Sequence, residues 1–196
     1  MSIVAFGESA LRLSTRDGQR FETAREVGLA VDGMASNAAA IAGRLGADAV
    51  WLSKLPDTPL GRRVVAELHE HGLETDVVWA DPADCRQGLL FYEDATAPRE
   101  SRLLQDRAGS AVATLTPGEL QMGRIQNADA VFTTGSMASM SDRAAETTGA
   151  LLRSAPGLRA LDLDFHPGLW SAEQASDTAL IAPADVPVMI GKGFRS

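Results

Sequence analysis

The chain has 196 residues, 45% of them hydrophobic, and a formal net charge of −8. This length is enough for one buried core and fits one domain better than two. The acidic balance argues against nucleic acid as a partner, because phosphate binding needs clustered Lys and Arg side chains.

The sequence also limits the cellular setting. No apolar run approaches the roughly 18 residues that a membrane-spanning helix needs. Residues 1–13 lack the basic start and long apolar core of a signal peptide. We therefore expect a cytoplasmic protein with no membrane partner. Cys85 is the only cysteine, so no internal disulfide forms, and we interpret it as a small apolar residue.

The first half of the chain predicts strands and helices in alternation. Residues 3–6 predict a short buried strand that ends at Gly7 and Glu8, where open α/β sheets bind ligands. Residues 10–31 alternate weakly and predict two exposed strands joined by a hairpin turn at 16–19. Helices are expected over 36–45 and from Asp57 to about residue 71, with a buried strand over 49–53 between them. Asp57 or Thr58 can cap the second helix, and Pro59 suits its first turn.

The second half continues this alternation and ends irregularly. We expect strands over 77–79, 87–92, 102–105, 130–134 and 159–163, a short helix starting near 117–120, and an amphipathic helix over 142–154. Strands that alternate with helices imply a parallel sheet with crossover helices, and the inserts at 10–31 and 86–107 are the exceptions. Pro183 and Pro187 interrupt any helix in the tail. A short strand over 188–190 has nothing after it to cover it, so we expect a chain that ends within a domain.

A small-residue turn before the first predicted helix is the strongest candidate for ligand binding. Gly33 lets backbone approach a ligand closely, and the helix N-terminus offers free N–H groups. Asn37 can both donate to and accept from neighbouring hydroxyl groups. The alternative is a helix-start turn with a local asparagine hydrogen bond.

Several motifs in order resemble the PfkB (ribokinase-like) carbohydrate kinases, and among them the 2-keto-3-deoxygluconate kinases, over residues 1 to about 175. They are the Gly7-Glu8 opening, the set Gly33, Ala35, Asn37, Ala39 and Gly46, the segment 57–62, and the strand-end segment 161–170. Two positions depart from the family pattern. Asp32 and Pro56 stand where glycines are usual.

The resemblance implies an α/β, ribokinase-like three-layer domain with a mainly parallel sheet and a small β lid formed by about 10–31 and 86–107. Residues 1–196 would form an incomplete, C-terminally truncated domain of this kind. The implied activity is transfer of phosphate from ATP to a sugar or sugar acid, such as 2-keto-3-deoxygluconate. Lids in this family often mediate dimers, so a homodimer through the lid is also implied.

The resemblance assigns substrate-binding roles residue by residue. Glu8 should line the sugar pocket, although a solvated carboxylate at a strand end is the alternative. Gly33 and Asn37 should contact the sugar. Arg107 should bind the carboxylate of a sugar acid, because its guanidinium offers two parallel N–H donors to two oxygens. The alternative for Arg107 is a surface ion pair with Asp106 or another nearby acid.

Two further positions differ from the usual family residues. Gln105 is also expected to bind the substrate, and it sits where a tyrosine is more usual. His166 stands where family members commonly have arginine, and it either donates one ring N–H to the substrate carboxylate or is a structural residue of a loop. The three histidines show no metal-ligand spacing.

The apparatus for phosphate transfer is not evident in the sequence. Sugar phosphorylation needs a general base, donors around the transferring phosphate and a nucleotide pocket. The family's Gly-Ala-Gly-Asp motif and a Walker-type loop are both missing. We therefore assign no catalytic residue, and expect ATP and Mg²⁺ only for the complete family member. The 196 residues by themselves are expected to be inactive.

The alternative is a non-catalytic sugar-binding module or remnant. A dehydrogenase half is disfavoured, because no Gly-x-Gly-x-x-Gly follows the first strand.

Overall fold

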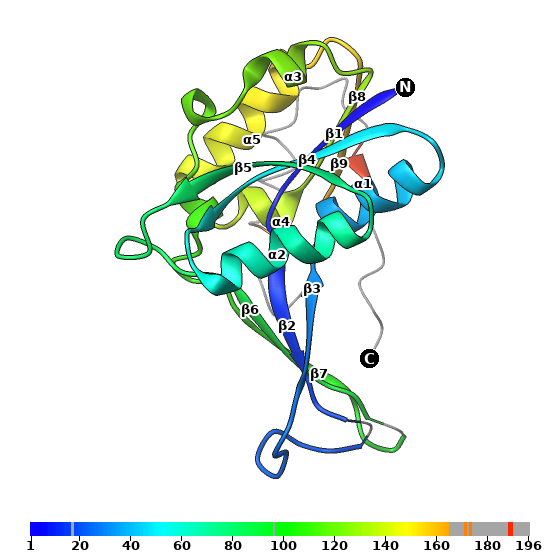
Figure 1. Ribbon diagram of the computed structural model, residues 1–196, viewed down its shortest axis with the longest axis vertical. Helices are drawn as coiled ribbons and strands as arrows, with labels where there is room; N and C mark the ends of the chain where they lie inside the picture. Colours follow the sequence, from blue (N-terminus) through cyan, green and yellow to red (C-terminus); the bar gives the residue numbers. More distant parts are fainter. Residues whose placement is uncertain (17, 96, 165–170, 172, 174–187, 190–196) are drawn as a thin grey trace.

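The computed structural model describes residues 1–16, 18–95, 97–164, 171, 173 and 188–189. Within these residues the chain forms a large parallel sheet between two layers of helices, and a smaller sheet that projects from it (Figure 1). The expected α/β architecture with a parallel sheet and a small β extension is thus confirmed.

The large sheet has six strands in the order β10-β9-β8-β1-β4-β5, and every pair of neighbours is parallel. Its strands are β1 (Ser2–Phe6), β4 (Asp48–Pro56), β5 (Glu74–Ala80), β8 (Ala130–Thr134), β9 (Leu158–Asp162) and β10 (Val188–Met189). Because parallel strands need crossover connections, their carboxyl ends all lie at one edge of the sheet. Ligands bind at this edge in open α/β proteins.

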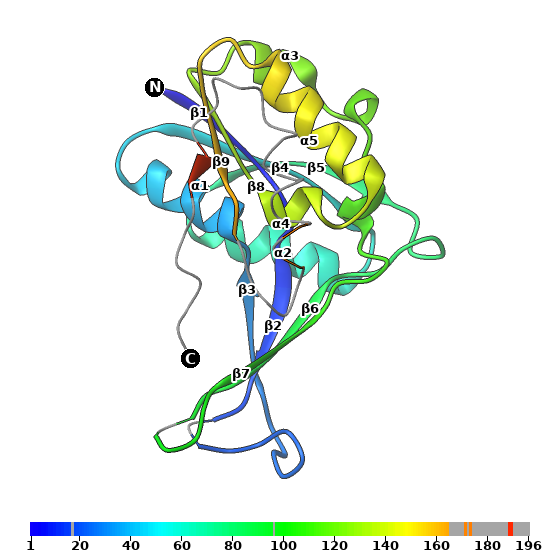
Figure 2. The same ribbon diagram turned by 180° about the vertical axis from the view of Figure 1, so that it is seen from behind.

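The helices lie on both faces of the large sheet (Figure 2). One face is covered by α1 (Met34–Arg44) and α2 (Pro59–Glu70), and the other by α3 (Met122–Gln126), α4 (Gly135–Ala138) and α5 (Asp142–Ser154). Two 3₁₀ turns, η1 (Ala111–Thr114) and η2 (Pro117–Glu119), precede α3. The start of α2 follows the expected capping rule, because the Thr58 hydroxyl accepts from the Gly61 N–H at 3.2 Å.

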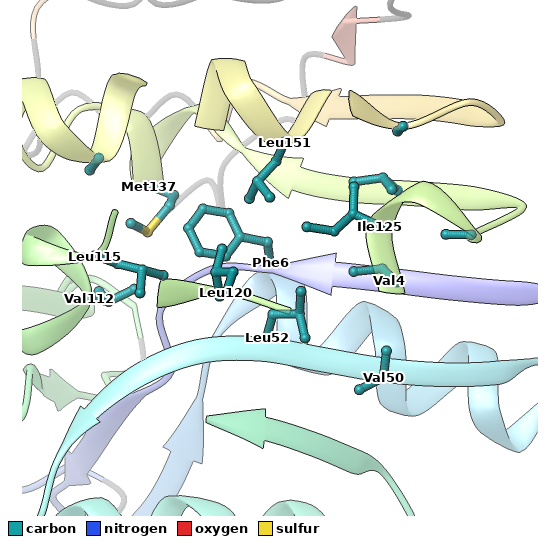
Figure 3. Packing of buried hydrophobic residues seen from close by; sticks show 14 residues of the cluster. Val4, Phe6, Val50, Leu52, Val112, Leu115, Leu120, Ile125, Met137 and Leu151 are labelled. Atoms are coloured by element: carbon teal, nitrogen blue, oxygen red, sulfur yellow. The ribbon is translucent and has the colours of Figure 1, made fainter. Parts of the chain in front are cut away.

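Alternate residues of the central strands fill two apolar cores. Phe6 and Leu52 pack with Ile125, Met137 and Leu151 under the face that α3–α5 cover (Figure 3). The intervening residues of the same strands, Ala5 and Trp51 among them, pack against α1 and α2. A strand buried on both faces in this way reads as a continuous apolar run, which explains why the sequence located β1, β4 and β8.

The small sheet has the order β3-β2-β6-β7 and consists of β2 (Ala10–Ser14), β3 (Gly28–Asp32), β6 (Leu89–Glu93) and β7 (Arg102–Asp106). Strand β2 runs antiparallel to β3 and parallel to β6, and β6 is antiparallel to β7. Paired residues share a face of a sheet, so the register divides the side chains into two sets. We call the set with Arg12, Asp32, Leu90 and Gln105 the polar face. The opposite set is the apolar face, with Leu11, Leu13, Leu29, Val31, Leu89, Phe91, Leu104 and Asp106.

One local expectation was wrong, and three short elements were not predicted. Gln19 N–H donates to the Arg16 carbonyl, but β2 and β3 are not joined by a tight hairpin turn, because residues 15–27 separate them. The sequence also gave no sign of η1, α3 and α4. These elements have four or five residues each, too few for a 3.6-residue period to be recognised.

Candidate functional site

The predicted site residues gather where β1 leaves the large sheet and enters the small one. Glu8 lies in the turn between β1 and β2, Arg107 directly follows β7, and Gly33 and Asn37 begin α1. The carboxyl end of a central parallel strand is the expected position for a ligand site in this architecture. The structure therefore brings together residues that are up to 99 positions apart in the chain.

Glu8 and Arg107 form a buried ion pair. The Arg107 Nε–H donates to Glu8 Oε2, and the two side chains are only 13% and 7% exposed. Glu8 is therefore not a solvated carboxylate, and the ion pair of Arg107 is a buried one with Glu8 and not a surface pair with Asp106. The outward-facing Asp106 pairs instead with Arg86.

A glycine makes room for the Glu8 carboxylate. A Cβ atom added to Gly88 would overlap Glu8 Oε1 and would lie 2.9 Å from the Ser110 hydroxyl oxygen. Glu8 Oε1 is buried and has no hydrogen-bond partner among the residues that the structure describes. A buried acceptor without a partner is costly, so this oxygen can gain free energy from a donor that a ligand or water brings.

The two Nη groups of Arg107 have weak partners. Nη1 donates to Gln105 Oε1 at 3.4 Å, and Nη2 donates to the Met140 sulfur at 3.3 Å. Guanidinium–carboxylate hydrogen bonds are normally about 2.7–2.9 Å long, and a thioether is a weak acceptor. A ligand carboxylate could therefore replace both partners while Glu8 keeps the guanidinium oriented.

The small-residue turn at Gly33 is required by the packing of the chain itself. A side chain at this position would overlap the Glu8 carbonyl oxygen and would approach Ser9 Oγ to 2.7 Å. The buried hydroxyls of Ser9 and Ser36 hydrogen-bond at 2.6 Å, and Ser36 also donates to the Gly33 carbonyl at 3.0 Å. These contacts fix the β1–β2 turn against the start of α1. No described side chain caps that helix, so its first N–H groups lack a side-chain acceptor among these residues.

Asn37 belongs to a second polar group, which lies at the other end of the polar face of the small sheet. Its side-chain N–H donates to Asp32 Oδ1 at 3.2 Å, and Arg12 Nη1 donates to Asp32 Oδ2 at 2.9 Å. The Arg12 guanidinium also lies 6.0 Å from the centre of the Tyr92 ring. Asn37 is exposed, so it is available to a ligand while it is held by Asp32.

The ends of β8 and β9 add further polar side chains at the same sheet edge. Ser136 donates to Asp164 Oδ2 at 2.5 Å and lies 3.1 Å from the Thr134 hydroxyl. Asp164 has a left-handed backbone with φ of 49°, which is uncommon outside glycine and is best tolerated by Asp and Asn. His166, the remaining predicted site residue, lies outside the described residues.

A cleft of about 570 Å³ lies elsewhere, beside the ends of β4 and β5. Two pairs of its polar groups bond to each other: Lys54 donates to Glu119 at 2.7 Å, and Cys85 donates to the Asp81 carbonyl. Burial raises the pKa of the Cys85 thiol, which agrees with its interpretation as an unreactive residue. None of the predicted site residues lines this cleft, and we do not assign the function to it.

The described residues contain neither a metal-binding cluster nor a membrane-spanning helix. No cluster of three or more His, Cys, Asp and Glu side chains there could hold a metal ion. No helix in that part of the structure has the length and apolar character to cross a membrane.

Sequence reasoning missed Arg12, Gly88 and Met140, and it noted Asp32 only as a departure from a motif. Arg12 left a signal, because it is a charged residue between Leu11 and Leu13 in an alternating strand, and so had to lie on the opposite face from them. Gly88 and Met140 left none, since their roles depend on contacts with residues far away in the chain.

Comparison with known proteins gives consistent matches. The family model described as pfkB family carbohydrate kinase matches residues 2–186. A 2-dehydro-3-deoxygalactonokinase of Haloferax volcanii is 43% identical over 199 aligned positions, which cover 99% of this chain and 62% of the relative. A 2-dehydro-3-deoxygluconokinase of Thermoproteus tenax is 28% identical over 182 positions, covering 92% of this chain and 55% of the relative.

A solved structure agrees with these relatives. The crystal structure of 2-dehydro-3-deoxygluconokinase from Thermotoga maritima superposes with a TM-score of 0.86 and 26% identity, over 92% of this chain and 56% of that one. The chain thus spans between 55% and 62% of the length of these three proteins.

Proposed function

The chain belongs to the pfkB family of carbohydrate kinases, and on that premise we propose that these residues form the substrate-binding part of a kinase for a 2-keto-3-deoxy sugar acid. The substrate has two chemically different ends, a carboxylate and a chain of hydroxyl groups. The candidate site has a matching division between Arg107 on one side and the Asn37 group on the other.

The observation that carries the proposal is the state of Arg107. Its Nε–H is held by Glu8, while the Nη groups donate, within the described part of the chain, only to a distant amide oxygen and a sulfur atom. This arrangement orients the guanidinium, and a carboxylate can easily displace the present partners of Nη1 and Nη2. Hydrogen bonds to charged groups contribute about 1.5–3 kcal/mol each, so the exchange favours an anionic ligand.

Glu8 has two parts in this proposal. Its Oε2 positions Arg107, and its buried Oε1 accepts a hydrogen bond that only a donor from outside the described residues can supply. A substrate hydroxyl or a bound water fits this requirement. The N–H groups at the uncapped start of α1 add donors for the keto or hydroxyl oxygens of the same molecule.

We propose 2-keto-3-deoxygalactonate as the first substrate to test and 2-keto-3-deoxygluconate as the second. The two acids differ in configuration at one carbon. The relative named for the galactonate is 43% identical to this chain, and the relative named for the gluconate is 28% identical.

ATP with Mg²⁺ is the phosphate donor that we propose for the complete protein. The described residues do not fit a metal site of their own, since they contain no cluster of three potential ligands. We therefore assign neither a metal ligand nor a catalytic base to them. Their proposed contribution is to bind and orient the sugar acid and to exclude water from it.

We also propose that the apolar face of the small sheet joins two copies of the chain. Its outermost row contains Leu29, Leu13, Phe91 and Leu104 in register. Leu104 is 65% exposed and Leu29 38% exposed, whereas Leu11 at the base of the same face is fully buried. Sedimentation of the protein tests this, because Leu104→Glu should shift a dimer to monomer.

A coupled assay of ADP release tests the proposed activity. The purified product of the complete reading frame is offered both sugar acids and, as a neutral control, fructose. We expect turnover of at least one sugar acid and a much lower rate with fructose. Binding heat without turnover would support the alternative, a sugar-binding protein without catalysis. Absence of both binding and turnover for the two acids would overturn the proposal.

A further inference from the structure

Asp32 stands where the family pattern has a glycine, and the structure gives its carboxylate two partners. Oδ2 accepts from Arg12 Nη1 at 2.9 Å, and Oδ1 accepts from Asn37 Nδ2 at 3.2 Å. The carboxylate thus joins the strand β2, the end of β3 and the first turn of α1. We call the three residues Arg12, Asp32 and Asn37 the bracket.

The bracket and Arg107 lie at opposite ends of the polar face. In the register of the small sheet, Arg12 is opposite Leu90 in β6, and Leu90 is opposite Gln105 in β7. Gln105 in turn accepts from Arg107. Neighbouring strands are about 4.8 Å apart, so the backbones at Arg12 and Gln105 are separated by about 10 Å, with Leu90 between them. A six-carbon acid with its terminal oxygens can extend across this distance.

The bracket retains hydrogen-bonding capacity. Among the described residues, the Arg12 guanidinium makes one hydrogen bond, from Nη1, and its buried Nε–H has no partner. The side chains of Arg12 and Asp32 are 40% and 31% exposed, and Asn37 is exposed. The bracket therefore places hydrogen-bond donors next to acceptors. A hydroxyl group needs both, because it donates one proton and accepts at two lone pairs.

The arginines at the two ends differ in how readily they can bind the substrate carboxylate. Each end holds one arginine and one carboxylate, so each is neutral as a unit. The Nη groups of Arg107 donate to weak acceptors that a carboxylate can replace. Arg12, in contrast, already donates from Nη1 to the nearby carboxylate of Asp32. The substrate carboxylate is therefore better placed at Arg107, and its hydroxyl-bearing end at the bracket.

Resting on the proposed function, we infer that the bracket selects between sugar acids by the configuration of a hydroxyl group in the hydroxyl-bearing half of the substrate, which begins at C4. A site that hydrogen-bonds a substrate hydroxyl discriminates strongly, because its polar groups lose their partner when the hydroxyl points elsewhere. The galactonate and gluconate forms of 2-keto-3-deoxy acids differ in configuration at C4, the first carbon of that half. Arg12 and Asp32 are thus specificity-determining residues.

Titration calorimetry with the purified protein tests the inference through the ratio of the two dissociation constants. We expect the wild type to prefer one epimer, and Asp32→Gly and Arg12→Ala to reduce that preference at least about tenfold, equivalent to loss of one hydrogen bond. Asp32→Asn keeps the shape and tests the charge if Asp32→Gly fails to fold. The matched control is Asp106→Asn, which removes an arginine-paired carboxylate from the opposite face.

Because both epimers are measured on one preparation, a reduced folded fraction cancels in the ratio. An unchanged ratio in all three bracket variants, or equal affinities in the wild type, would overturn the inference while leaving the proposed function intact. If the wild type binds neither acid, the proposed function fails instead. A change of ratio in Asp106→Asn as large as in the bracket variants would also count against the bracket.

Discussion

Asp106 and Arg107 are neighbours in the chain but belong to two ion pairs of different character. Asp106 points to the apolar face and pairs with Arg86 at 2.6 Å, with both side chains more than 40% exposed. Arg107 points to the other side and pairs with Glu8, with both side chains nearly buried. Successive residues at a strand end point to opposite faces. Asp106 therefore faces solvent, while the next residue, Arg107, faces the candidate site.

This comparison shows that burial, not the presence of a charge pair, distinguishes the candidate functional arginine. Exposed pairs contribute little, because water already solvates both charges. A buried pair is costly to form and more costly to break, since removing one partner leaves a charge without water or counterion. The arrangement at Glu8 is therefore weak evidence for stability but strong evidence that the orientation of Arg107 matters.

The largest expected effect is that of breaking the buried pair. Glu8→Gln should lower the free energy of unfolding by about 3–5 kcal/mol, because it leaves the Arg107 charge buried without a counterion. Urea denaturation followed by circular dichroism measures this. Asp106→Asn is the matched control and should cost less, since its partner Arg86 is accessible to water.

A double substitution sharpens the same test. Replacing the pair by Glu8→Gln with Arg107→Met removes the stranded charge, so most of the lost stability should return. Equal losses in Glu8→Gln and Asp106→Asn would show that the two pairs do not differ as their burial implies.

The second effect concerns binding. Arg107→Ala should weaken binding of the preferred sugar acid by about 100-fold, because two charge-assisted hydrogen bonds disappear. Calorimetry on protein confirmed as folded measures this, and the methyl ester of the same acid, which has no negative charge, should lose much less. Arg86→Ala is the control on the opposite face. An equal effect of the two arginine substitutions would contradict the assignment.

A smaller effect is expected where a glycine makes room for Glu8. Gly88→Ala should destabilise the protein by about 1–3 kcal/mol, because the added Cβ overlaps the Glu8 carboxylate and crowds Ser110. The same change at Gly123 in α3 has nothing within 4 Å of the new atom and should stabilise by up to about 1 kcal/mol. Thermal unfolding distinguishes the two signs. Stabilisation by Gly88→Ala would mean that Glu8 lies elsewhere in solution.

The smallest effect is the pH dependence of the exposed pair. The hydrogen bond from Arg86 lowers the pKa of Asp106 below its usual value, so the folded state holds the ionised form more strongly than the unfolded state does. The resulting stability is complete above the unfolded pKa of about 3.9 and is lost as pH falls through the lower folded pKa. The difference in unfolding free energy between the wild type and Asp106→Asn should therefore shrink below about pH 4. A difference that grows as pH falls would refute this.

The elements that the sequence located best are those with a strong local signal. Helix α5 was predicted with its observed bounds, because its apolar residues repeat along a helix that Ser141 caps. Strand β8 was likewise predicted at its observed bounds, as a continuous apolar run. The membership of the pfkB family followed from motifs whose order survives in the sequence.

The contacts at the candidate site show what local sequence cannot contain. From the sequence, Arg107 could equally have paired with its neighbour Asp106. The residues around Arg107 and around Glu8 contain no local signal that these two side chains pair. Gly88 falls within the strand expected over 87–92 and has no local feature that sets it apart. Only the structure shows that its missing side chain accommodates a carboxylate that lies 80 positions earlier in the chain.

By itself, the sequence determined the parallel α/β architecture, the family and most of the residues that meet at the carboxyl end of β1. Hydrophobic periodicity and capping act over a few residues, and so they can be recognised without coordinates. Only the tertiary structure decided which arginine is buried, which carboxylate holds it and how Asp32 links Arg12 to Asn37. Those outcomes depend on strand register and on exclusion of water, and both are set by the packing of the whole chain.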